Sequence, residues 1–357
     1  MILGCSSATV KIDTLSAEET TDVSEETAQD SASPSSDRPE DDSASNETQD
    51  SDDPADSGQP ESEESCDETL GSEGQESLSL HFVEWLLQHP EHDGDFVRAD
   101  ISGGSFGGLI SDQDCVLVDP VIFVHGNSDR ALGGFGGWEP VRDAFLDAGH
   151  RSAELYATTY GPADPALSAQ YSHTQEYVQH IRSFIEAVLS YTEAEKVDVI
   201  GHSLGVTIAR AAIIGGALPG SNGQSYELGP PLTAQIDTFV GIAGANWGMA
   251  TCAVPASPIC SAQTGFYPGW WNGFELQQLS SILQVLNQST GREGQHIFSI
   301  WSTLDAVIGS GCVVWGQNTC RVPGDDDDLH VLLDHLSIRS LTTDAQIQMV
   351  VEHTVPQ

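Results

Sequence analysis

A serine between two glycines, in the segment Gly201-His202-Ser203-Leu204-Gly205, separates an apolar run at 197–200 from an Ala- and Ile-rich run at 206–217. The first run has the length and composition of a buried strand, and the second has those of a helix. A tight strand-to-helix turn leaves no room for side chains two residues before and after the serine, which explains the glycines. The turn would lift the Ser203 hydroxyl above the sheet, close to a helix N-terminus that stabilises developing negative charge. Ser203 is therefore predicted to be a nucleophile.

Apolar runs bounded by turn residues alternate with helical patterns along most of the chain. Strands are expected at 116–124, 155–160, 197–200, 236–243, 296–301 and 329–333, and helices at 78–87, 170–191, 206–217 and 345–351. Such alternation predicts an α/β fold whose mostly parallel sheet is covered by helices on both faces.

A serine hydroxyl becomes a good nucleophile only when a base takes its proton, so a histidine and an orienting acid are required. After an elbow of this kind the acid comes next in the chain, and the histidine follows it. Asp305 comes just after the strand expected at 296–301, and no other carboxylate stands between Glu293 and Asp325. Asp305 is therefore the predicted acid. The alternative is a solvated turn aspartate.

The predicted base is His335, which comes two residues after the strand expected at 329–333. From that position its ring can return over the nucleophile. His330 is the main rival, but it lies inside the expected strand, where its ring would point into the packing. His353 follows the last expected helix.

The tetrahedral intermediate of acyl transfer needs backbone N–H donors for its oxyanion. Leu204, directly after the nucleophile, is expected to supply one. Asn127, in the loop that follows the early strand, is expected to supply the other, because Gly126 before it allows close approach of the backbone. His125 and His202 are expected to be structural.

The first 76 residues differ from the rest in composition. They carry 23 Asp and Glu against two basic residues and have no run of large apolar side chains, so they are predicted to be a disordered tail or tether. Residues 77–357 then form the catalytic domain. Each part contributes half of the net charge of −42. A domain this acidic is not expected to bind nucleic acid through phosphates or to approach anionic membranes.

Six of the seven cysteines suggest disulfide bonds. Cys252 and Cys260 stand close together, as do Cys312 and Cys320, and neither pair has the spacing of a zinc site. We expect two short-loop disulfides. A third disulfide, Cys66–Cys115, is expected on less evidence, because its two cysteines are far apart in the sequence. These bonds favour an oxidising, extracytoplasmic compartment.

The remaining cysteine, Cys5, follows Ile2-Leu3-Gly4, as in the end of a bacterial lipoprotein signal. The charged and apolar segments that should precede such a cysteine are absent, so a lipid anchor at Cys5 would require a truncated start; the alternative is a stray cysteine. The chain is accordingly expected to be secreted or anchored at the outer surface. The sequence contains no run of 18 apolar residues, so no transmembrane segment is expected.

Two further segments leave alternatives open. Residues 249–280 include Phe266-Tyr267-Pro268-Gly269-Trp270-Trp271 and Phe274, which suit either an apolar wall or lid beside the site or a loop that packs on the domain. The four acids Asp325–Asp328 suit a solvated loop better than a calcium site.

Three segments together resemble the class 2 lipase group of α/β-hydrolases, and lipase-like extracellular polyhydroxyalkanoate depolymerases are similar at the same places. The segments are Val121-Ile122-Phe123-Val124-His125-Gly126-Asn127, Gly201–Gly205 and Ala243-Gly244-Ala245-Asn246-Trp247-Gly248. The resemblance covers about residues 115–350. It implies an α/β-hydrolase fold and hydrolysis of carboxylic esters, including lipid esters, without a metal or organic cofactor.

Three functions follow as hypotheses. The first is a carboxylesterase or lipase that works through an acyl-enzyme. The second is an extracellular depolymerase of aliphatic polyesters, and the third is a non-catalytic surface binding protein on a hydrolase scaffold.

Overall fold

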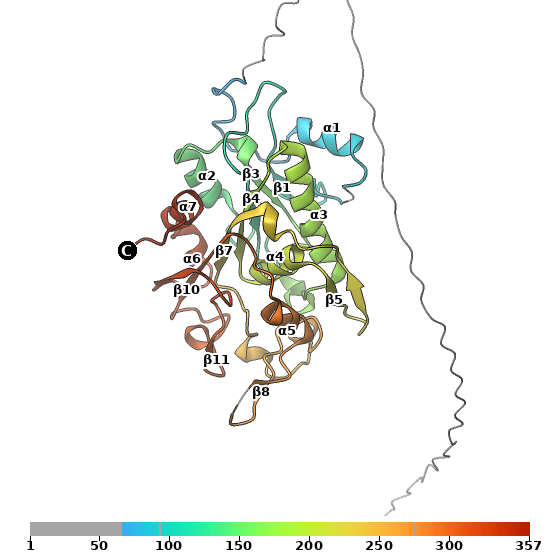
Figure 1. Ribbon diagram of the computed structural model, residues 1–357, viewed down its shortest axis with the longest axis vertical. Helices are drawn as coiled ribbons and strands as arrows, with labels where there is room; N and C mark the ends of the chain where they lie inside the picture. The colour runs from blue at the N-terminus through green and yellow to red at the C-terminus, as the bar shows by residue number, and fades with distance from the viewer. Residues whose placement is uncertain (1–65, 93, 275) are drawn as a thin grey trace, which may run out of the picture. The chain divides into compact units, whose positions relative to one another are not determined.

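A seven-stranded sheet forms the centre of the computed structural model, which describes residues 66–357 apart from Asp93 and Glu275 (Figure 1). The strand order is β1-β3-β2-β4-β7-β10-β13, and only the β1–β3 pair is antiparallel. The mostly parallel sheet expected from the alternating pattern is therefore confirmed. Its strands are β1 (Ser105–Phe106), β2 (Val121–Val124), β3 (Leu155–Thr158), β4 (Val197–His202), β7 (Ile236–Ile242), β10 (His296–Ser302) and β13 (Asp327–Val331).

Helices cover both faces of this sheet, which explains why β2 and β4 are buried along their whole length. One apolar core lies under α1, α3, α4 and α5, and a second lies under α2, α6 and α7 (Figure 1). The helices are α1 (Leu80–Gln88), α2 (Glu139–Asp147), α3 (Gln175–Thr192), α4 (Leu204–Ile214), α5 (Ser281–Gln288), α6 (Ser337–Ser340) and α7 (Thr343–Glu352).

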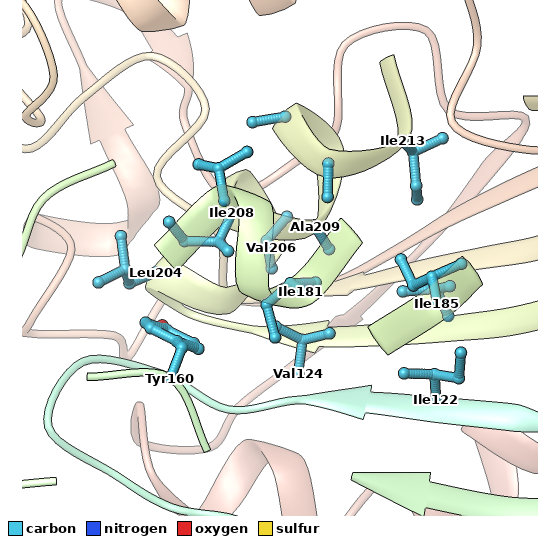
Figure 2. Packing of buried hydrophobic residues seen from close by; sticks show 14 of the residues in the cluster. Ile122, Val124, Tyr160, Ile181, Ile185, Leu204, Val206, Ile208, Ala209 and Ile213 are labelled. Carbon is cyan, nitrogen blue, oxygen red and sulfur yellow. The ribbon is translucent and has the colours of Figure 1, made fainter. Parts of the chain in front are cut away.

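Helix α4 is buried at every residue and fixes the position of the turn that precedes it. Figure 2 shows Val206 and Ala209 of α4 close to Val124 of β2 and Ile181 of α3. A Cβ atom at Gly205 would lie 2.3 Å from the carbonyl oxygens of Val124 and His125, closer than real contacts allow. Glycine therefore lets the first turn of α4 rest directly on the end of β2.

Several elements differ in length from the expected ones. The strand expected at 116–124 is limited to β2, because Pro120 has no N–H for the ladder and Asp119 precedes it. The preceding N–H groups of Leu117 and Val118 bond instead to Oε1 of Glu154.

The helix expected at 170–191 begins only at Gln175, where the hydroxyl of Thr174 caps it. A separate short helix, η2 (Pro165–Gln170), precedes it.

Three small antiparallel pairs, together with β1, α2, α5 and α6, are additions to the expected order. The pairs are β5 (Ala217–Pro219) with β6 (Ser225–Glu227), β8 (Trp270–Trp271) with β9 (Leu276–Gln277), and β11 (Val313–Val314) with β12 (Gln317–Asn318).

The last part of the expected acidic tail is attached to the domain. Cys66 forms a disulfide with Cys115, and the guanidinium of Arg151 donates to the carbonyl oxygens of Asp67 and Glu68. Residues 66–76 therefore contact the fold, although the expected boundary followed residue 76. The rest of the expected tail, with Cys5, lies outside the described residues.

All three expected disulfides are present: Cys66–Cys115, Cys252–Cys260 and Cys312–Cys320. In each of the last two pairs the two cysteines stand eight positions apart in a loop. None of the helices in the described part of the chain has the length and hydropathy that crossing a membrane requires.

Candidate active site

The predicted nucleophile stands on a strained turn between β4 and α4. Ser203 has φ 57° and ψ −124°, a conformation that non-glycine residues rarely adopt. Its backbone N–H bonds to the carbonyl oxygen of Ile242 on β7, which holds the turn against the neighbouring strand. The sheet and the buried helix α4 therefore hold Ser203 in this unfavourable backbone conformation. The Ser203 side chain faces the carboxyl edge of the sheet.

The structure brings Ser203, His335 and Asp305 together from the ends of three strands. Nε2 of His335 is 2.9 Å from Oγ of Ser203, and Nδ1 of His335 is 2.6 Å from Oδ2 of Asp305. A carboxylate can only accept, so Nδ1 carries the proton and Nε2 faces the hydroxyl as an acceptor. This is the tautomer that a general base for Ser203 requires.

The acid of this group is firmly held. Oδ1 of Asp305 accepts from the backbone N–H groups of Val307 and Ile308 at 2.8 and 2.9 Å, which leaves Oδ2 for His335. The exposed fraction is 1% for Asp305, 6% for His335 and 7% for Ser203. The hydrogen-bonded chain is therefore shielded from solvent.

The two rival histidines lie elsewhere. His330 is an exposed residue of β13 whose ring packs at a tilt against that of Trp301, with 4.4 Å between the ring centroids. The expectation that its ring would point into the packing is wrong, because β13 is an edge strand with a partly exposed face. His353, at the end of α7, pairs with Asp237 at 2.9 Å and stacks on His296.

The two predicted oxyanion donors flank the nucleophile. Leu204 is the first residue of α4, and the first N–H groups of a helix have no acceptor within the helix. On the other side, a Cβ atom at Gly126 would lie 3.0 Å from Cβ of Ser203, so the loop after β2 runs directly past the nucleophile. Asn127 is held there by its side chain, which donates to the carbonyl oxygen of Ser168 at 3.1 Å.

His125 supports this loop from below. Its ring stacks on Tyr160 with 4.2 Å between centroids, and its Nε2 accepts from the Tyr160 backbone N–H at 3.1 Å. Burial lowers the pKa of His125 to about 4, so the ring is neutral near pH 7.

His202, which was expected to be structural, has a contact that the sequence did not indicate. Its Nε2 lies 2.8 Å from the backbone carbonyl oxygen of His335. A carbonyl oxygen only accepts, so Nε2 of His202 carries a proton and donates. Burial lowers the pKa of His202 well below its ordinary value.

The long segments around the site expose apolar side chains. Residues 249–280 follow β7 and the loop containing Asp305 follows β10, so both start at the carboxyl edge of the sheet. Within 249–280 the aromatic residues divide: Phe266 is buried in the core, whereas Trp270, Trp271 and Phe274 are exposed. Exposed apolar side chains also stand beside two of the site residues and on the β11–β12 turn, at Leu304, Val307, Trp315 and Leu336.

The acidic run at 325–328 forms ion pairs. Asp325 and Asp328 both contact the guanidinium of Arg321, at 2.8 and 2.7 Å, and Asp326 contacts Arg292. Neither hypothesis from the sequence, a solvated loop or a calcium site, included these ion pairs. Arg292 stands more than 30 residues before the run, and Arg321 lies in the loop that precedes it.

Comparison with known proteins identifies a protein family that matches this chain. The sequence model described as Lipase (class 2) matches residues 118–348, whereas a search of curated protein sequences gives no match.

Among solved structures, a Bacillus licheniformis lipase in its propeptide form is 13% identical, with a TM-score of 0.47; the match covers 71% of this chain and 54% of that one. Aspergillus fumigatus lipase B is 15% identical, with a TM-score of 0.47 and coverage of 71% and 57%. An extracellular α/β-hydrolase from a Paenibacillus species is 13% identical, with a TM-score of 0.39 and coverage of 66% and 100%. The matches therefore span a little over half the length of the first two proteins.

Proposed function

Because the chain belongs to the class 2 lipase family, we propose that it is a serine carboxylic-ester hydrolase that works through an acyl-enzyme. The observation that carries this proposal is the hydrogen-bonded chain from Asp305 through His335 to Ser203, with distances of 2.6 and 2.9 Å. The strained backbone of Ser203 supports it further, since strain of this kind is retained where function uses it.

The proposed reaction has two halves. Oγ of Ser203 attacks the ester carbonyl carbon while Nε2 of His335 takes the hydroxyl proton, and Asp305 stabilises the imidazolium that forms. The backbone N–H groups of Leu204 and Asn127 bind the oxyanion. His335 then gives its proton to the departing alcohol. A water molecule, deprotonated by His335, then attacks the carbonyl carbon of the acyl-enzyme, and His335 returns that proton to Oγ of Ser203 as the acid leaves.

The substrate is proposed to be an uncharged, largely apolar ester. The exposed aromatic residues Trp270, Trp271 and Phe274 favour an extended apolar substrate, which keeps a solid aliphatic polyester as a second candidate beside soluble and lipid esters. The net charge of −42 disfavours anionic substrates and surfaces.

The place of action is proposed to be extracytoplasmic, because disulfides persist in oxidising compartments and this domain holds three. A lipid anchor at Cys5 remains an expectation from the sequence.

The test is hydrolysis of p-nitrophenyl esters of rising acyl length, with polyhydroxyalkanoate granules in parallel. The unmodified chain should release p-nitrophenol, and Ser203→Ala and His335→Ala should each lower kcat by about 10⁴–10⁶-fold. His330→Ala is the matched control and should stay within threefold of the unmodified chain. Activity of Ser203→Ala within tenfold of the unmodified chain would overturn the mechanism. A chain that hydrolyses none of these esters would favour the non-catalytic binding protein.

A further inference from the structure

A buried ion pair joins two segments on either side of the proposed active site. Nη1 of Arg339 lies 2.9 Å from Oδ2 of Asp129, and the two residues are 1% and 3% exposed. They are 210 positions apart in the sequence. Asp129 lies in the same loop as Gly126 and Asn127, and Arg339 lies on α6, four residues after His335.

Each partner is fixed by further contacts. Oδ1 of Asp129 accepts from the backbone N–H groups of Arg130 and Phe135 at 3.0 and 3.2 Å, and the backbone N–H of Asp129 donates to the carbonyl oxygen of Gly126. The carboxylate of Asp129 thus holds Arg130 and Phe135, and its backbone N–H holds Gly126, so Asp129 connects residues 126–135 of the loop after β2.

The arginine is fixed in turn by its surroundings. Its guanidinium carbon lies 5.2 Å from the centre of the Trp138 ring. A Cβ atom at Gly136 would lie 2.5 Å from Nη2 of Arg339, so glycine makes the space that the guanidinium fills. Within the described residues, Asp129 is the carboxylate that pairs with Arg339, and the close packing holds the guanidinium in this position.

A pair like this is a poor way to gain stability. Removing two charges from water costs about as much as their attraction returns, and apolar residues of the same volume often serve as well. What the pair supplies is a fixed separation between two segments. On one side is the loop with the Asn127 N–H, and on the other is the segment that begins at His335.

We propose that Asp129 and Arg339 are positioning residues for the oxyanion hole. Resting on the proposed function, the pair holds the Asn127 N–H at the distance from Leu204 and Ser203 that the oxyanion requires. His335 has its own supports in Asp305 and His202, so the loop after β2 is the part that loses its place when the pair is lost.

The chain offers a matched control in Asp114 and Arg151. This pair is also buried, with 3.0 Å between Oδ1 of Asp114 and Nη2 of Arg151. The Asp114 carboxylate likewise accepts from two backbone N–H groups, those of Ile110 and Cys115. It lies beside the Cys66–Cys115 disulfide, and its bonds go to segments other than those that carry the proposed site.

The experiment compares Asp129→Asn, Arg339→Met and the double variant with Asp114→Asn, all well below their melting temperatures. Asp129→Asn leaves Arg339 buried without a counter-charge, so its melting temperature should fall. The double variant removes both charges and should recover most of that fall. Its kcat, however, should stay about 10²-fold below that of the unmodified chain, with KM changed by less than about threefold.

Two readouts separate positioning from a merely structural role. An alkylboronic acid, which forms a tetrahedral adduct with the serine, should bind the double variant about 10²-fold more weakly, whereas a product fatty acid should bind equally well. The midpoint of the acidic limb of the pH–rate profile, which reports His335, should not move. Asp114→Asn should lower the melting temperature and leave kcat and boronic acid affinity unchanged.

The outcomes are distinct from those of the proposed function. An unmodified chain that hydrolyses esters, together with an inactive Ser203→Ala, establishes the function first. If the double variant then regains kcat as it regains stability, the pair is structural and the inference is overturned. A shift of the acidic limb with unchanged boronic acid affinity overturns it as well, because His335 would be the part that moved. Low kcat with recovered stability and weakened boronic acid binding supports it.

Discussion

Nε2 of His202 donates a hydrogen bond of 2.8 Å to the backbone carbonyl oxygen of His335. The residue before the proposed nucleophile thus holds the backbone of the proposed base, while the nucleophile itself meets the imidazole of that base 2.9 Å away. Two bonds between the same two segments fix both the position and the tilt of the imidazole. The low pKa of His202 keeps its ring neutral, so this contact adds no charge beside His335.

This bond can be tested with a pair of isosteric variants. The amide nitrogen of glutamine reaches about as far as Nε2 of histidine, whereas that of asparagine reaches only as far as Nδ1. His202→Asn should therefore lose the bond to His335 and lower kcat about 10-fold or more, because small displacements at a reacting centre are costly. His202→Gln should keep most of the activity. Equal kcat values for the two variants, with equal folded fractions by circular dichroism, would show that the bond does not matter.

The tail can be tested by two truncations. Removing residues 1–65 should leave the melting temperature and the activity unchanged, because that acidic, Ser-rich segment has little apolar surface to bury. Removing residues 1–76 deletes Cys66, and with it the bond to Cys115, as well as the contacts with Arg151 and Arg142. We expect a lower melting temperature for the second truncation alone. A large drop already at the first would mean that the tail packs on the domain.

Loss of the Cys252–Cys260 bond should act locally. Closing a loop this short stabilises by about 2–3 kcal/mol in the chain-entropy model. Cys252→Ser/Cys260→Ser should speed amide hydrogen exchange within 249–280 and alter the ratio of long-chain to short-chain ester hydrolysis, with the sheet still protected. The control is Cys312→Ser/Cys320→Ser, which should leave exchange in 249–280 unchanged. The prediction is wrong if exchange rises across the whole sheet instead.

Stability should fall in mild acid because of buried histidines. His173 donates from Nδ1 to the carbonyl oxygen of Thr264, and burial lowers its pKa to about 4 from an ordinary 6.5. At pH values between these two pKa values, His173 binds a proton in the unfolded chain but not in the folded chain. Stability is therefore intact above the ordinary pKa of 6.5 and falls as the pH approaches 4, by up to about 3 kcal/mol for this group.

Urea unfolding of the unmodified chain and of His173→Asn checks this. Asparagine keeps the donor to Thr264 but does not titrate. The difference in unfolding free energy between the two chains should shrink as the pH falls from about 7 to about 4.5. Parallel curves would show that His173 is not the group responsible.

Much of the fold follows from local sequence patterns. The turn at 201–205 could be predicted because two glycines and two apolar runs meet there, and Gly205 indeed lies where a Cβ atom would strike the backbone of β2. Asp305 and His335 could be put forward because each follows a strand whose apolar run is legible. Short elements such as β1 and α5 could not be predicted, because two and eight residues show too little hydrophobic periodicity.

The contacts that hold the site residues in place could not be predicted from the sequence, for a different reason. Asp129 and Arg339 are 210 residues apart, and neither stands in a pattern that requires the other. The bond from His202 to His335 likewise depends on how two strand ends meet in space. The orientation of His330 depended on β13 being the edge of the sheet, which strand patterns alone do not reveal.

The most direct measurement is labelling with a serine-directed phosphonate, followed by intact mass and peptide mapping of the full chain. The account predicts one adduct per chain, on the peptide that contains Ser203, formed at least about 10³-fold more slowly in His335→Ala and at nearly the unmodified rate in His330→Ala. Labelling at another residue, or an ester-hydrolysing chain that takes no label at Ser203, would contradict it.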